Sequence, residues 1–162
     1  MKTIAIPTDF TIESLNTVKG ALAMLKDEKV NLILVYSAYL SGSITDLLFL
    51  SKPKYLASMQ NDKFTEACEI LTNKYASQIE SFQVELFPGT SHSFFTHFLA
   101  GNNIDEVFIP KNYRLKPGKR GFDPIPYFKK TKLPLTEVDW HATSDIPEKN
   151  LVAELFLVTN HL

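Results

Sequence analysis

The chain has almost no cysteine: among its 162 residues, Cys68 is the only one. A single thiol cannot form an internal disulfide, which excludes the disulfide-stabilised secreted scaffolds. No apolar run approaches the roughly 20 residues that a membrane helix needs, and the apolar stretch at residues 3–7 is too short for a signal peptide. We therefore expect a soluble protein of the cytoplasm.

The chain also lacks the motifs of the common enzyme classes. It has no P-loop lysine motif, no paired carboxylates suited to Mg²⁺ and no nucleophile elbow. His92 and His97 are five residues apart, which separates them by roughly 140° around a helix, so they do not share a face on which to bind a metal. We expect neither a catalytic residue nor a metal site.

What is present is the composition of an ordinary globular domain, with 44% apolar and 22% charged residues. The length suits one domain and is enough to bury about two-thirds of the unfolded surface. We assign residues 1–140 to one α/β domain and residues 141–162 to a C-terminal tail of the same domain.

The net charge is −1, but the charge is unevenly distributed. The segment 111–132 holds one acid, Asp123, and eight of the 17 Lys and Arg residues (Lys111, Arg114, Lys116, Lys119, Arg120, Lys129, Lys130 and Lys132). The rest of the chain has nine basic and 17 acidic residues, a net charge of −8. This basic segment is interpreted either as a solvated loop or as an arm that binds an anionic small molecule or protein. Nucleic acid is disfavoured because no nucleic-acid module is present.

Short apolar runs alternate with stretches of helical periodicity along the chain. The apolar runs predict buried strands over residues 3–7, 31–36, 83–87, 106–110 and 135–138. Helices are expected after Thr11, which we predict as a cap, over residues 64–82, after Thr90 or Ser91, and over residues 124–130. This alternation implies right-handed crossovers and a doubly wound parallel sheet with helices on both faces.

Cys68 lies in the apolar stripe of the long helix. We predict a core thiol rather than a nucleophile, because apolar surroundings raise the pKa of a thiol. Two segments stay open. Residues 40–57 fit a short helix or a folded loop, and the tail 141–162 has no assigned secondary structure.

Three segments resemble the universal stress protein family. Residues 4–11 (Ile-Ala-Ile-Pro-Thr-Asp-Phe-Thr) are similar to the family's opening strand followed by Pro-Thr-Asp-Phe-Ser. Residues 100–109 are similar to its glycine, acidic residue and apolar strand before the nucleotide loop, and residues 132–138 match its last strand more weakly. The resemblance covers about residues 1–140, and its specificity comes from the order and spacing of the three segments.

The resemblance implies a Rossmann-like, five-stranded parallel sheet of order 3-2-1-4-5 and a homodimer that often forms through the last strand. ATP-binding members hold the nucleotide at the carboxyl ends of strands one and four, the switch point of the sheet. Pro7, Thr8 and Asp9 would then lie at the adenosine end. Asp9 could accept hydrogen bonds from ribose hydroxyls or from backbone amides.

The chain departs from the family in the nucleotide loop. ATP-binding members follow strand four with Gly, two residues, Gly, nine residues and then Gly-Ser or Gly-Thr, so that backbone amides approach the phosphates. Here the strand ends at Pro110, which has no amide donor, and Lys111 follows. A Gly118-Lys119-Arg120-Gly121 element stands eight residues late, and Thr131 follows it without a glycine.

We therefore predict a universal stress protein-like, non-enzymatic protein that acts as a dimer through partner binding, with no required cofactor and with ATP binding weak or lost. The alternative is a nucleotide-binding switch or weak ATPase that uses Asp9 and the displaced glycines. The candidate nucleotide- or anion-binding residues are Pro7, Thr8, Asp9, Lys111, Gly118, Lys119, Arg120, Gly121 and Thr131.

Overall fold

The computed structural model describes residues 1–39, 56–57, 59–89, 91–118 and 120–140. A five-stranded sheet forms its centre, with strands β1 (Lys2–Thr8), β2 (Val30–Ser37), β3 (Ile79–Phe87), β4 (Glu106–Pro110) and β5 (Leu135–Val138). All neighbouring strands are parallel and their order is β3-β2-β1-β4-β5. The sheet class and strand order expected from the sequence are confirmed.

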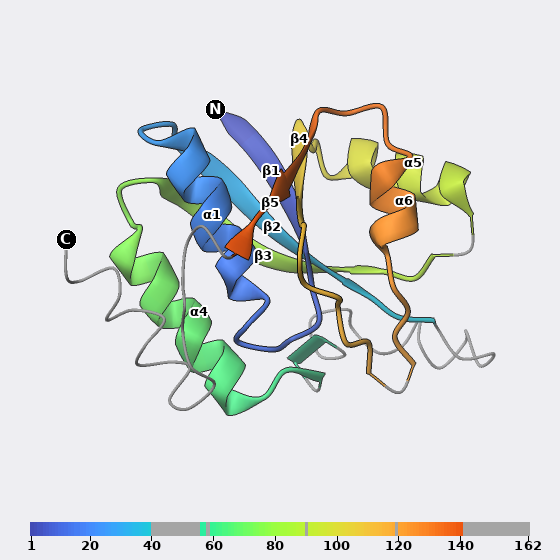
Figure 1. Cartoon of the computed structure of the whole chain (residues 1–162), viewed down its shortest axis with the longest axis horizontal. Helices are drawn as coiled ribbons and strands as arrows, with labels where there is room; N and C mark the ends of the chain where they lie inside the picture. Colours follow the sequence, from blue (N-terminus) through green and yellow to red (C-terminus); the bar gives the residue numbers. More distant parts are fainter. Residues whose placement is uncertain (40–55, 58, 90, 119, 141–162) are drawn as a thin grey trace.

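Helices cover both faces of the sheet (Figure 1). Helices α1 (Leu15–Leu25) and α4 (Asp62–Lys74) lie on one face, and α5 (His92–Gly101) and α6 (Ile125–Lys129) lie on the other. Alternate residues of β1 supply the two cores, since Ile4 and Ile6 pack with the α1 and α4 side chains and Ala5 packs with those of α5 and α6. Strands buried on both faces are continuously apolar, as the sequence indicated.

Two predicted helix boundaries are wrong. The helix expected over residues 64–82 ends at Lys74, and Ile79 and Phe82 belong to β3. The spacing of these two residues happens to continue the helical pattern. No glycine or proline between the helix and the strand signals that the helix ends, so the prediction extended it too far. Helix α1 begins at Leu15 and not directly after Thr11, but the Thr11 hydroxyl accepts a hydrogen bond of 3.2 Å from the Ser14 amide, so it caps the turn that leads into the helix.

Other local predictions are confirmed. Cys68 is buried in the core, where burial raises the pKa of its thiol to about 12. Ser91 caps α5 by accepting a hydrogen bond of 3.1 Å from the amide of Phe94. Thr90, most of the segment 40–57 and the tail 141–162 lie outside the described residues. None of the helices within the described ranges is long and apolar enough to cross a membrane.

Candidate functional site

The switch point of the sheet lies between β1 and β4. After β1 the chain passes through α1 on one face to β2, whereas after β4 it passes through α6 on the other face to β5 (Figure 1). The two connections therefore separate at the carboxyl ends of the strands, next to Asp9 and Lys111. This is the position at which open α/β sheets bind ligands.

Both oxygens of the Asp9 carboxylate at this position accept hydrogen bonds from the chain itself. Oδ1 accepts from the backbone amide of Thr11 at 3.0 Å and from the Thr11 hydroxyl at 2.5 Å. Oδ2 accepts from the hydroxyl of Tyr113 at 2.5 Å and from the backbone amide of Lys116 at 2.8 Å. The Asp9 carboxylate therefore has four hydrogen-bond donors from the protein itself. The sequence suggested that its donors would be ribose hydroxyls or backbone amides, and two of the four are backbone amides.

The backbone beside Asp9 adopts an uncommon conformation. Phe10 has a φ of 62°, in the left-handed region that residues other than glycine rarely adopt. Its ring stacks on Tyr36 at a centroid distance of 4.2 Å and meets Phe64 edge-on at 5.3 Å. Its amide donates to the Thr8 hydroxyl at 3.1 Å. Packing therefore holds the turn that directs Asp9 toward the loop after β4.

Tyr113 is held from two sides. Its hydroxyl bonds to Asp9, and its ring stacks on Trp140 at a centroid distance of 4.2 Å. Trp140 in turn donates from its indole nitrogen to the Thr17 hydroxyl of α1 at 2.9 Å. Burial, and next the hydrogen bond to Asp9, raise the pKa of Tyr113 above its ordinary value. The phenol is therefore a fixed, protonated donor.

The displaced glycine element pairs with the end of β2. The amide of Gly121 donates to the carbonyl of Gly118 at 2.9 Å, which closes a tight turn. The Arg120 carbonyl accepts from the Tyr39 amide at 2.8 Å, and residues 38 and 121 form an antiparallel bridge. Lys119, between these residues, lies outside the described part of the chain. The loop after β4 thus reaches from β4 past β1 to β2.

The remaining candidate residues lie apart. Pro7 is buried inside β1 and pairs in register with Val35. Lys111 donates its amide to the Val138 carbonyl at 2.8 Å, and it lines a cavity on the α6 side. Thr131 follows α6 and lines another cavity together with Asp105, which precedes β4. Thr131 is therefore at the amino edge of the sheet, away from Asp9.

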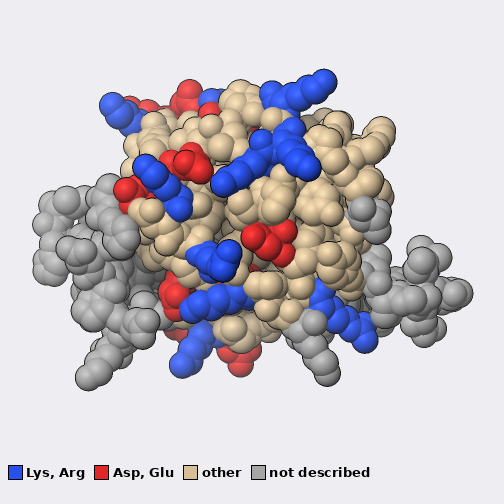
Figure 2. Space-filling model, turned by 45° about the vertical axis from the view of Figure 1, so that its right-hand side comes forward, with Lys and Arg blue, Asp and Glu red and all other residues tan. Residues whose placement is uncertain are grey.

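The cavity on the α6 side has a volume of about 540 Å³. Six charged side chains line it, four cationic and two acidic (Lys111, Arg114, Lys129, Lys130, Asp123 and Glu137). All four cations are exposed, and none forms an ion pair with another described residue. Figure 2 shows a face of the molecule on which Lys and Arg side chains gather around a smaller acidic group.

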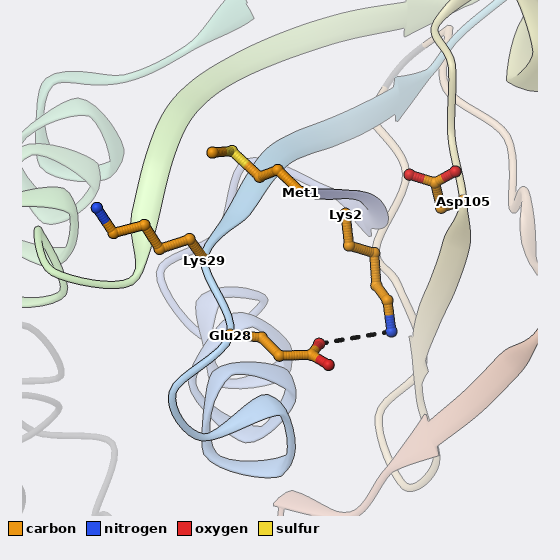
Figure 3. A pocket seen from close by; sticks show the side chains of 5 residues that line it. All are labelled: Met1, Lys2, Glu28, Lys29 and Asp105. Carbon is orange, nitrogen blue, oxygen red and sulfur yellow. Dashed lines mark ion pairs between the residues drawn. The ribbon is translucent and has the colours of Figure 1, made fainter.

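A cavity of about 610 Å³ lies at the amino edge of the sheet, lined by Met1, Lys2, Glu28, Lys29 and Asp105 (Figure 3). Its charges are already paired with the chain. Lys2 Nζ lies 3.1 Å from Glu106 and 3.5 Å from Glu28, and Asp105 accepts from the amide of Thr3 at 2.8 Å. These contacts tie β1 to its neighbours and leave the cavity without an evident ligand.

The sequence predicted Asp9, and backbone amides as one kind of donor to it, but not the residues that reach this site from elsewhere in the chain. Tyr113, Lys116 and Trp140 belong to no family motif, and Tyr113 is 104 positions from Asp9. The available signal was indirect, since Pro110 and the late glycines marked the loop as different.

No family model matches the chain, and no curated protein matches it in sequence. The crystal structure of the hypothetical protein PH0823 is similar, with 20% identity and a TM-score of 0.50, over 85% of this chain and 95% of that chain. A protein from the universal stress protein family of Burkholderia pseudomallei is similar with 6% identity and a TM-score of 0.50, over the same shares of 85% and 95%.

An AMP-bound universal stress protein family protein from Arabidopsis thaliana aligns over 95% of this chain and 99% of its own, with 11% identity and a TM-score of 0.49. Sequence identities this low support a shared fold but do not indicate a shared ligand. The parallel sheet, its strand order and the helices on both faces agree with the first two comparisons. Over its described residues, this chain has the fold of the universal stress protein structures.

Proposed function

We propose that the chain is a universal stress protein-like, non-enzymatic protein in which its own loop takes the place that the family's ATP-binding members give to nucleotide. The observation that carries this proposal is the Asp9 carboxylate, which accepts four hydrogen bonds from Thr11, Tyr113 and Lys116. A ribose that replaced the loop would leave the Tyr113 hydroxyl and the Lys116 amide without their acceptor. Because unpaired donors cost free energy, ATP binds weakly or not at all.

The phosphate side of the crevice supports the same proposal. Pro110 has no amide to offer at the start of the loop. The amide of Gly121 is used on the Gly118 carbonyl, and the amide of Phe122 donates to the Ser37 carbonyl at 3.2 Å. These amides would have to leave their present acceptors before they could bind phosphate, as the amides of an anion nest do.

Partner binding and dimerisation complete the proposal. Among the described residues β5 pairs only with β4, and an edge strand offers backbone donors and acceptors to a second copy. The described residues contain no group of three His, Cys, Asp or Glu side chains that could hold a metal ion. A reducing compartment such as the cytoplasm suits the single, buried Cys68 thiol.

The decisive test is the nucleotide content of protein purified from cells. The protein is denatured, and the released small molecules are measured by mass spectrometry against the protein concentration. We expect no stoichiometric ATP, ADP or AMP, and no hydrolysis of added ATP. Stoichiometric nucleotide would overturn the proposal and favour the nucleotide-binding switch, in which the loop moves away from Asp9.

The basic segment supplies the means of binding an anionic partner. Side chains of Lys and Arg contact phosphates and carboxylates without a glycine nest, and such contacts are screened by salt. We expect Lys119→Ala together with Arg120→Ala to weaken binding to an immobilised acidic peptide at low salt, with unchanged circular dichroism. Binding that is insensitive to salt, or to this double substitution, would remove the arm from the proposal.

A further inference from the structure

The cavity on the α6 side lies at the carboxyl edge of the sheet, and Asp9 is not among its lining residues. Part of its wall is apolar, with Pro110 and Leu115 buried and Ile125 half-buried. Its volume of about 540 Å³ falls within the roughly 300–1,000 Å³ of typical small-molecule sites. The pocket is therefore large enough for a ligand beyond a single inorganic ion.

Four cations from two parts of the chain line this pocket. Lys111 begins the loop, Arg114 follows within it, and Lys129 and Lys130 stand at the end of α6. They form no ion pair with the described residues, so their mutual repulsion is not relieved by a neighbouring acid in salt-bridge contact. A phosphate dianion relieves this repulsion, and the Arg114 guanidinium can bind two of its oxygens side by side.

The two acids in the pocket restrict the choice of ligand. Asp123 uses Oδ1 to accept from the amide of Ile125 at 3.0 Å, which leaves Oδ2 available. The side chain of Glu137 makes no hydrogen bond or ion pair with the described residues. A long polyanion would meet repulsion at both carboxylates, whereas hydroxyl groups would donate to them.

We propose that this pocket binds a phosphate monoester on a small, hydroxyl-bearing molecule, that is, a sugar or polyol phosphate. The phosphate lies among Lys111, Arg114 and Lys130, and the hydroxyl groups donate to Glu137 and Asp123. The inference rests on the proposed anion-binding role of the basic segment, and it adds a small-molecule ligand that these pocket side chains bind.

The experiment is a calorimetric titration of the full chain, at low salt, with ribose 5-phosphate, ribose and inorganic phosphate as probes. We expect ribose 5-phosphate to bind at least about tenfold more tightly than inorganic phosphate, because hydroxyl bonds to charged acceptors add to the phosphate contacts. Ribose alone should not bind. Arg114→Gln with Lys130→Gln should weaken ribose 5-phosphate by about tenfold or more.

Two further variants separate this proposal from its neighbours. Glu137→Gln should remove the preference for ribose 5-phosphate over inorganic phosphate while phosphate still binds. Lys63→Gln with Lys132→Gln is the matched control, since it removes two positive charges from exposed positions that do not line the pocket, and it should leave the affinity unchanged. Loss of binding in that control would show that the ligand responds to the overall charge of the protein and would overturn the pocket. Equal affinity for the sugar phosphate and for phosphate, or no binding of either, would also overturn it.

Discussion

The hydroxyl of Tyr113 donates a hydrogen bond of 2.5 Å to Oδ2 of Asp9, between positions 104 residues apart. This bond joins the end of β1 to the loop after β4, across the switch point of the sheet. The amide of Lys116 reaches the same oxygen at 2.8 Å, so the loop has both a side-chain and a backbone attachment. At the switch point, where doubly wound sheets commonly bind ligands, Asp9 is therefore hydrogen-bonded to the protein's own loop.

Asp9→Asn should destabilise the fold. The amide side chain keeps one acceptor oxygen and presents an NH₂ group to donors, so at least two of the four hydrogen bonds are lost. We expect a loss of about 2 kcal/mol in the free energy of unfolding, measured by urea denaturation. Asp27→Asn is the control, because Asp27 is exposed, and its effect should stay within about 0.5 kcal/mol. Equal effects of the two substitutions would contradict the role of Asp9.

Substitutions of Tyr113 should be visible in the fluorescence of Trp140, the only tryptophan. Tyr113→Phe removes the hydroxyl but keeps the stacked ring, so it should cost about 1 kcal/mol and leave the emission maximum unchanged. Tyr113→Ala uncovers the indole and should move the emission to longer wavelength. A red shift already in Tyr113→Phe would show that the bond to Asp9, and not the stacking, positions the loop.

The sequence predicted the sheet well because its central strands carry a local signal. β2 is apolar without a break from Leu32 to Tyr36, and this short run of branched and aromatic residues is typical of a strand inside a parallel sheet. β3 is an edge strand with half-exposed residues, so Ile79 and Phe82 carried no strand pattern of their own. Their spacing from Tyr75 matched a helix, so the pattern predicted them as part of the helix that in fact ends at Lys74.

The site was harder to predict because its contacts are not local. Asp9 stood in a recognisable motif, but the phenol that donates to it from 104 positions away has no signature in the chain. Phe10 illustrates the same limit, because its positive φ depends on stacking with Tyr36 and Phe64. Pro110 predicted that one backbone amide donor is missing, but it did not predict that the following loop would bond to Asp9.

The buried thiol of Cys68 should make stability depend on pH in the alkaline range. Its pKa is raised from 9.0 to about 12 by burial, so above pH 9 the unfolded chain releases a proton that the folded chain keeps. Folded-state stability is therefore lost as the pH rises. Relative to Cys68→Ala, the wild type should lose about 1.4 kcal/mol between pH 7 and pH 10, measured by urea denaturation. A constant difference between the two proteins would contradict the burial.

Gly89 should tolerate no side chain. Its φ is 43°, and an added Cβ would lie 2.4 Å from a ring carbon of Phe122 and 2.8 Å from one of Phe87. Gly89→Ala should therefore cost about 2–4 kcal/mol through backbone strain and overpacking, measured by thermal unfolding. Gly101→Ala is the control, since an added Cβ there meets nothing within 4 Å, and it should be neutral or slightly stabilising. Similar melting temperatures for the two variants would refute the packing of Phe122 on this turn.

The proposed dimer can be tested at the outer edge of β5. The carbonyls of Pro134 and Val138 accept hydrogen bonds from β4, at 3.0 Å from Val107 and 2.8 Å from Lys111. Because backbone direction alternates along a strand, the amide of Glu137 points away from β4, to the side on which a second copy would pair. Glu137→Pro removes that donor without touching the bonds to β4.

We expect the wild type and Glu137→Ala to scatter light as dimers at tens of micromolar, and Glu137→Pro to scatter as a folded monomer. Glu137→Ala removes the same charge but keeps the amide, so a difference between the two variants isolates the backbone bond. Dimers of all three proteins would place the interface elsewhere. A monomeric wild type would end the proposal of a dimer, and the exposed edge would then need another means of avoiding self-association, such as the charge that Glu137 itself presents there.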